Sequence, residues 1–163
     1  MKFVAHASVI TLSLIATAAS AQAVRTEKNM SLDLANQIAA ATVAACSTNG
    51  YNVTVAVVDR AGSVRALQRA DNAGPHTVGA AQGKAYTSAS ARNTTAAMLE
   101  NVQKNPGAAT LVDIPGFLVL GGGVPVKVGN EVIGAVGVGG APGGHLDEQC
   151  ANAGIAKVAE LLK

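Results

Sequence analysis

The sequence predicts an α+β domain in which a five-stranded antiparallel sheet carries helices on both faces. Short apolar segments occur in neighbouring pairs joined by tight turns, which is typical of β-hairpins. Segments with helical spacing of apolar residues separate these pairs. The segment 131–139 is nearly all valine, isoleucine, alanine and glycine, so both of its faces need to be covered by other layers.

Five segments are expected to form strands. Residues 52–59 and 63–69 flank a turn in which Asp59 suits the first position and Gly62 the last. A third strand is expected at 117–120, and residues 125–128 and 131–139 flank a Gly-Asn turn. Because short turns join these segments, antiparallel pairing is favoured over parallel βαβ units.

Four further segments have helical patterns. Ser31 is a favourable N-cap for a first helix, which Asn49-Gly50 ends. The alanine-rich segment 77–91 places small residues on one stripe, which favours close packing against a neighbour. A third helix is expected within 93–102, and a last one at about 147–162.

Residues 1–21 have the pattern of a cleaved secretory signal peptide. Lys2 is followed by an apolar run at 9–19 and by small residues that permit cleavage after 21 or after 23. The run is too short to span a membrane, and no later segment qualifies. We therefore expect a periplasmic or secreted protein with one domain, residues 22–163, and no membrane insertion after cleavage.

Composition and charge argue against several classes of function. The formal net charge is +2, and the chain has two Tyr, two Phe and no Trp, so nothing indicates nucleic acid as a partner. Gly74 and Gly79 have the interval of a phosphate-binding loop, but Ala80-Ala81 stands where Lys-Ser/Thr is required. Pro142 replaces the third glycine of a dinucleotide fingerprint. No nucleophile elbow, HExxH motif or standard zinc spacing occurs. The residues therefore give no support for a hydrolase, a nucleotide-binding protein or a zinc protease.

The histidines His76 and His145 are the main candidates for chemistry. Each stands in a loop with Gly and Pro just before a predicted helix, where the positive end of the helix dipole favours a neutral imidazole. Neutral imidazole is the form that ligates a metal. The alternative is a solvent-facing histidine that caps a helix. Lys84 and Arg92 either meet carboxylates of a ligand or are ordinary solvated charges.

The two cysteines, Cys46 and Cys150, are predicted to pair, because disulfides are typical of exported chains. Cys46 lies late in the first predicted helix and Cys150 early in the last. A bridge therefore requires these helices to lie side by side and antiparallel on one face of the sheet. It would close a loop of about a hundred residues, worth about 4 kcal/mol. The alternative is a pair of buried thiols.

Four sequence blocks together resemble the GlcG/HbpS family of heme-binding and heme-degrading-type domains, which is related to the C-terminal domain of PduO-type proteins. The blocks are VTVAVVDRAG, GPHTVGAAQGKAYTSAS, IPGFLVLGGGVPV and VIGAVGVGGAPGGHLDEQCANAG. They occur in the family's order, and the resemblance covers about 30–163. It implies a profilin- or PAS-like fold, in agreement with the elements predicted above. It also implies a homo-oligomer built from dimers, such as a hexamer or an octamer.

The resemblance implies binding of heme or a related tetrapyrrole, in heme and iron handling or in redox sensing, with heme degradation among the family's activities. Matching positions give His76, Lys84, Tyr86 and His145 as cofactor-binding candidates. His76 is the first candidate for the heme iron and His145 the second. Two hypotheses stay open beside this one. The same pocket could bind or process a small organic acid, through Lys84, Tyr86 and Arg92, or a corrinoid. Alternatively, the chain is a self-assembling structural module.

Overall fold

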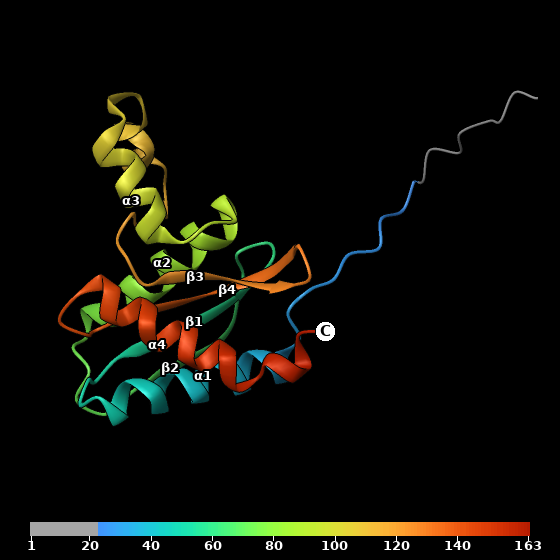
Figure 1. The fold of residues 1–163 in the computed structure, drawn as a ribbon, viewed down its shortest axis with the longest axis vertical. Helices are drawn as coiled ribbons and strands as arrows, with labels where there is room; N and C mark the ends of the chain where they lie inside the picture. The colour runs from blue at the N-terminus through green and yellow to red at the C-terminus, as the bar shows by residue number, and fades with distance from the viewer. Residues whose placement is uncertain (1–22) are drawn as a thin grey trace, which may run out of the picture.

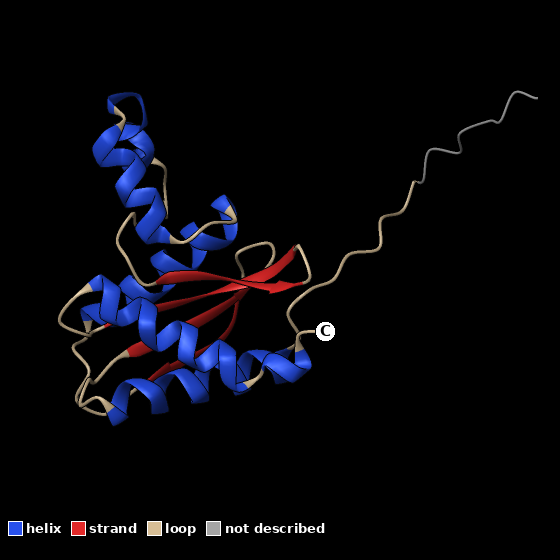
Figure 2. Ribbon diagram, viewed as in Figure 1, coloured by secondary structure: helices blue, strands red, loops and turns tan. Residues whose placement is uncertain are grey.

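The computed structural model describes residues 23–163, which form an antiparallel sheet between two layers of helix (Figures 1 and 2). The predicted signal peptide, residues 1–21, lies outside the described residues. The strands are β1 (Thr54–Asp59), β2 (Val64–Arg69), β3 (Gly123–Val128) and β4 (Glu131–Gly139), in the spatial order β2-β1-β4-β3. All three pairings are antiparallel, so the predicted α+β class with an antiparallel sheet is confirmed.

The helices come close to the predicted segments. They are α1 (Leu32–Thr48), α2 (His76–Ala91), α3 (Thr95–Lys104) and α4 (Gly144–Lys157), with 3₁₀ helices η1 (Pro106–Asp113) and η2 (Ala159–Leu161). Ser31 caps α1 as predicted, since its side chain accepts a hydrogen bond from the backbone N–H of Leu34 at 3.1 Å. The last helix begins three residues earlier than predicted, and its end breaks into η2.

The prediction of a strand at 117–120, which would have made the sheet five-stranded, is wrong, because this segment joins no sheet. Gly116 precedes it with a φ of +84°, which turns the chain away from an extended path. The backbone N–H of Leu118 then donates to Oγ1 of Thr87 on α2 at 2.7 Å, and that of Leu120 donates to the Leu118 carbonyl. With these N–H groups bonded elsewhere, the segment does not extend the ladder, and the described sheet has four strands.

Each face of the sheet has its own hydrophobic core. On one face, the side chains of Val55, Val57, Val136 and Val138 are buried beneath α1 and α4. On the other face, Ala56, Val58 and Ala135 meet the alanine stripe of α2. The second core consists of small residues, so α2 lies very close to the strands. A Cβ atom on Gly137 of β4 would come within 2.0 Å of the Ala81 carbonyl oxygen, which only glycine avoids.

Helices α1 and α4 lie side by side and run in opposite directions across one face (Figure 1). A disulfide between Cys46 and Cys150 joins them, which confirms the predicted pairing. Gly154 permits the close approach, because a Cβ there would lie 1.9 Å from Oγ1 of Thr42 on α1.

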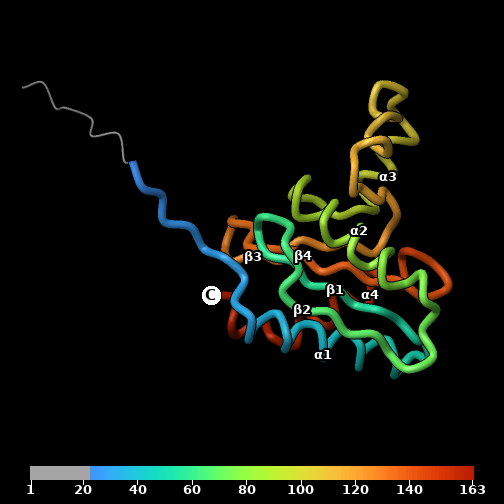
Figure 3. The backbone as a smooth tube through the Cα atoms, turned by 180° about the vertical axis from the view of Figure 1, so that it is seen from behind, coloured from blue at the N-terminus to red at the C-terminus, as the bar shows by residue number. Residues whose placement is uncertain are grey.

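The segment α3–η1 projects away from the sheet and its two helical layers (Figures 1 and 3). Few of its side chains are buried, and η1 has no buried residue. Within residues 23–163, no helix has both the length and the apolar character that crossing a bilayer requires.

Candidate functional site

Two adjoining hollows lie where β4 ends and α4 begins. The smaller one, called the small hollow here, has a volume of about 300 Å³. Its lining residues are His76, Ala80, Lys84, Leu120, Gly139, Gly140, Ala141, Pro142, Gly143, Gly144 and Asp147. The larger one, the large hollow, has a volume of about 590 Å³. Its lining residues are Ala96, Leu99, Glu100, Gln103, Leu120, Gly121, Gly144, His145, Glu148, Gln149 and Asn152. The two hollows share Leu120 and Gly144.

The two candidate histidines lie on the rims of these hollows, one on each. His76 lines the small hollow and His145 the large one, and both side chains are exposed. The structure corrects one detail of their predicted placement. His76 is the first residue of α2 and His145 the second of α4, so both stand inside the first helical turn.

The same local arrangement holds both imidazole rings. A glycine stands two residues before each histidine, and the ring folds back over it. A Cβ on Gly74 would lie 2.7 Å from Cε1 of His76, and one on Gly143 would lie 2.8 Å from Cε1 of His145. Side chains in a first helical turn point back toward the N-terminus, so glycine makes room for the rings. The GPH and GGH sequences thus place two imidazoles beside the glycine-rich loop 139–144.

A buried ion pair lies beneath the small hollow. Nζ of Lys84 on α2 is 2.7 Å from Oδ2 of Asp147 on α4, and the two side chains are only 3% and 4% exposed. Lys84 also donates to the Val138 carbonyl at 2.9 Å, while Oδ1 of Asp147 accepts from the Ala141 N–H at 3.0 Å. The pair therefore ties α2 and α4 to the end of β4 and to the loop that lines the hollow.

Burial and pairing act on Asp147 in opposite directions. Burial raises the pKa of its carboxyl above the ordinary value, and it outweighs the hydrogen bond and charge of Lys84 together with the Ala141 N–H, which lower it. Gly122 is required next to the pair, because a Cβ there would lie 2.7 Å from Cβ of Asp147 and 3.0 Å from Nζ of Lys84. Lys84 was expected as a cofactor-binding residue, and in the structure it holds the site together.

Glu148 is a site residue that the sequence did not reveal. It lines the large hollow with His145, and its Oε2 atom is buried without a hydrogen-bond partner among the described residues. Burial raises the pKa of this carboxyl. Asp147 was likewise missed as the partner of Lys84, since 63 residues separate the two in the chain. The GGHLDE sequence gave the only signal, as it places both carboxylates within one turn of His145.

Tyr86 and Arg92 lie away from the two hollows. Tyr86 is 37% exposed, and its ring meets that of Phe117 edge-on, with centroids 6.1 Å apart. Arg92 follows the last residue of α2, at the opposite end of that helix from His76. Lys84, Tyr86 and Arg92, the set expected for an organic acid, are therefore not brought together. Among residues 23–163, no group of three or more His, Cys, Asp or Glu side chains is placed to hold a metal ion.

Comparison with known proteins gives a relative in sequence and a structure of the same fold. GlcG of Escherichia coli K12 is 38% identical over 114 residues, which is 70% of this chain and 84% of GlcG. The crystal structure of a double mutant of HbpS from Streptomyces reticuli superposes with a TM-score of 0.79 at 36% identity, covering 94% of this chain and 98% of that one.

A more distant structure shares the fold alone. The PduOC complex with heme superposes with a TM-score of 0.70 at 23% identity, covering 78% of this chain and 94% of PduOC. The family model described as "Haem degrading protein HbpS-like" matches residues 30–156, which include both histidines, the ion pair and the disulfide. With this match and the GlcG identity, the chain belongs to the HbpS-like family, as the four sequence blocks predicted.

Proposed function

We propose that this chain is an exported homo-oligomeric protein that binds heme or a related tetrapyrrole in the hollows at the end of β4. It would act in heme and iron handling or in redox sensing. The supporting observation is the position of its two imidazoles. His76 and His145 stand exposed on the rims of two hollows that meet at Leu120 and Gly144.

The residues present are chemically suited to a heme. A neutral imidazole is an ordinary axial ligand of heme iron. Ala96, Leu99 and Leu120 provide apolar surface in the large hollow, whose volume lies within the usual range for ligand pockets. The N-terminal ends of α2 and α4 lie at the hollows, and their positive dipole ends favour propionate groups. Bound heme would supply a redox-active iron centre.

The residues that would hold the group have separate roles. His76 is the first proposed iron ligand and His145 the second. Lys84 does not serve as a propionate partner in this proposal, because its ammonium is already paired with Asp147 and the Val138 carbonyl. Tyr86 is left out because it lies elsewhere.

The family supports this choice of ligand. The description of the matching family names heme degradation, and the structure of PduOC, which has the same fold, has been solved in complex with heme. Export is supported by the Cys46–Cys150 disulfide, since such bridges persist in oxidising compartments. Self-association is supported by large apolar side chains left exposed at the projecting segment and beside it, namely Val112, Ile114 and Leu120.

A heme titration of the protein without residues 1–21 tests the proposal. Hemin is added to the wild type and to the variants His76→Ala, His145→Ala and the double variant, and the Soret band is recorded. The wild type is expected to shift the band saturably, and His76→Ala to weaken binding and change the spectrum. Gln82→Ala is the matched control, because Gln82 is exposed on α2 and lines neither hollow.

The possible outcomes distinguish a wrong choice of iron-ligating histidine from a wrong proposed function. Absence of a saturable Soret shift in the wild type would refute tetrapyrrole binding. A normal shift in His76→Ala together with a loss in His145→Ala would assign the iron to His145. Light scattering with and without hemin measures the assembly, for which a dimer-based hexamer or octamer is expected. Assembly without any hemin binding would instead favour a structural module.

A further inference from the structure

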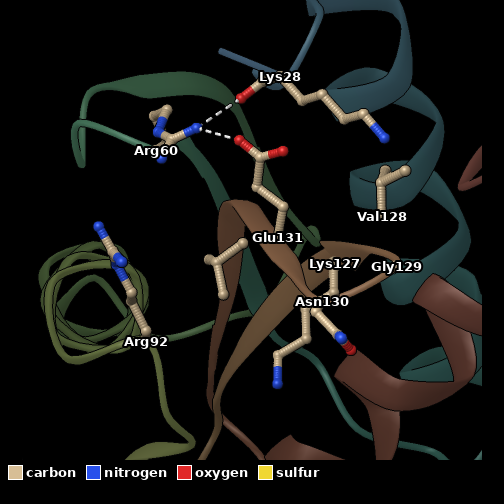
Figure 4. A pocket seen from close by; sticks show the side chains of 9 residues that line it. Lys28, Arg60, Arg92, Lys127, Val128, Gly129, Asn130 and Glu131 are labelled. Carbon is tan, nitrogen blue, oxygen red and sulfur yellow. Dashed lines mark hydrogen bonds and ion pairs between the residues drawn. The ribbon is translucent and has the colours of Figure 1, made fainter. Parts of the chain in front are cut away.

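A third hollow lies at the other end of the sheet, at the tip of the β3–β4 hairpin. It has a volume of about 620 Å³ and is called the basic hollow here (Figure 4). Its charged lining residues are Lys28, Arg60, Arg92, Lys127 and Glu131. Backbone and side chains of 128–130 and Val132 complete it. The lining thus contains four cationic residues and one carboxylate, in a protein whose overall net charge is only +2.

Arg60 is the fixed cation of this hollow. Its Nη1 donates to Oε1 of Glu131 at 2.6 Å and to the Lys28 carbonyl at 3.1 Å, and its Nε lies 3.3 Å from Glu27. Its side chain is only 17% exposed. The hydrogen bond and charge of Arg60 lower the pKa of Glu131, so that carboxylate stays ionised and holds the guanidinium in place.

The other three cations have no anionic partner among the described residues, because none of Lys28, Arg92 and Lys127 forms an ion pair there. Figure 4 shows Arg92 reaching from the end of α2 toward the side where Arg60 lies, while the Lys28 ammonium points away from Arg60. Lys127 is exposed on β3. Arg92 and Lys127 therefore contribute two positive charges, without an ion pair within residues 23–163, to this concave surface.

The backbone is irregular at Arg92 and in the β3–β4 pairing beside Lys127. Arg92 has a φ of +54°, the only non-glycine residue within 23–163 in the left-handed region. That conformation costs roughly 1–2 kcal/mol for an L-residue. The β3–β4 register shifts between Val126 and Lys127, where one residue of β4, Ile133, has no partner on β3. Residues held in such conformations are frequently functional.

From this geometry we infer that the basic hollow binds a small, multiply charged oxyanion, a phosphate monoester or a polycarboxylate. Planar guanidinium groups donate paired hydrogen bonds to such oxygens, and Lys127 adds a mobile point charge. The site is separate from the histidine hollows. Arg92 and His76 lie at opposite ends of the 16-residue helix α2, which at 1.5 Å per residue corresponds to roughly 24 Å.

Calorimetric titration of the full domain with inorganic phosphate, and in a second series with citrate, tests this inference at constant ionic strength. Saturable binding of at least one anion is expected, with Kd at or below about 1 mM. Arg92→Gln and Lys127→Gln should each weaken it about tenfold, the loss expected from one charge-assisted hydrogen bond. Phosphate alone would indicate a phosphate monoester as ligand, and citrate alone a polycarboxylate.

Arg65→Gln is the matched control, because it removes the same charge from an exposed residue of β2 that does not line the hollow. It should leave the Kd unchanged. Equal weakening in Arg65→Gln would show unspecific attraction to net charge and would overturn the inference. So would the absence of saturable binding of either anion. Hemin binding by Arg92→Gln should equal that of the wild type, which keeps this test independent of the proposed function.

Discussion

Replacing Lys84 by methionine should destabilise the protein strongly at neutral pH. Methionine keeps much of the length and apolar surface of the side chain but leaves the Asp147 carboxylate buried without its cation. The two side chains are 3% and 4% exposed, and their charged atoms are 2.7 Å apart. Removing one partner of a buried pair typically costs about 3–5 kcal/mol. The lost donation to the Val138 carbonyl is included in that range.

The direction of the pH dependence follows from Asp147. Its pKa already lies above the ordinary 3.8, and without Lys84 the burial effect would be opposed only by the Ala141 N–H, so the pKa should rise further. An acid whose folded pKa is raised favours folding when protonated and loses that stability as pH rises through the folded value. The loss of unfolding free energy in Lys84→Met, relative to the wild type, should therefore be largest at about pH 7 and shrink toward about pH 4.

Urea unfolding followed by circular dichroism measures both effects, with the disulfide intact in all variants. Lys84→Met, Asp147→Asn and the double variant form a cycle. The double variant should lose less than the sum of the single losses, by about 0.5–3 kcal/mol, because it leaves no unpaired buried charge. Additive losses would refute the reasoning. So would a Lys84→Met deficit below about 1 kcal/mol at neutral pH, the value typical of an exposed pair.

Two further predictions concern the layer formed by α1 and α4. The double variant Cys46→Ser/Cys150→Ser should lose about 4–5 kcal/mol of unfolding free energy, because the bridge joins residues 104 apart, and adding reductant should lower the urea midpoint of the wild type only. A reductant-insensitive wild type would contradict this. Glu148→Gln should be more stable than the wild type at about pH 7, because burial raises the pKa of this carboxyl above 4.5 and the ionised form is disfavoured. This difference in unfolding free energy should vanish near pH 4, because Glu148 is then more fully protonated in both the folded and the unfolded wild type. A difference that grows on acidification would show that the folded state stabilises Glu148 as a carboxylate.

Much of the fold could be predicted because its signals are local. Ser31 caps α1 through a hydrogen bond three residues along the chain, and the turns at Gly62 and Gly129 both take a positive φ. The alanine stripe Ala81, Ala85 and Ala89 indicated a closely packed helix, and it forms the second core. The segment 117–120 was misassigned because its sequence is typical of a strand, whereas its N–H groups are bonded by Thr87 and by local carbonyls. A side chain 31 residues away decided that outcome.

The candidate site, like the fold, could be predicted from the sequence only in part. The sequence alone nominated His76 and His145 from their neighbouring glycines and helix starts, and it predicted the cysteine pair from the expected compartment. The partnership of Lys84 with Asp147, the buried oxygen of Glu148 and the gathering of Lys28, Arg60, Arg92 and Lys127 depend on residues far apart in sequence. Local propensities and turns are set by neighbours along the chain, but burial and ion pairing arise only once the sheet has formed and α2 and α4 have packed on its faces.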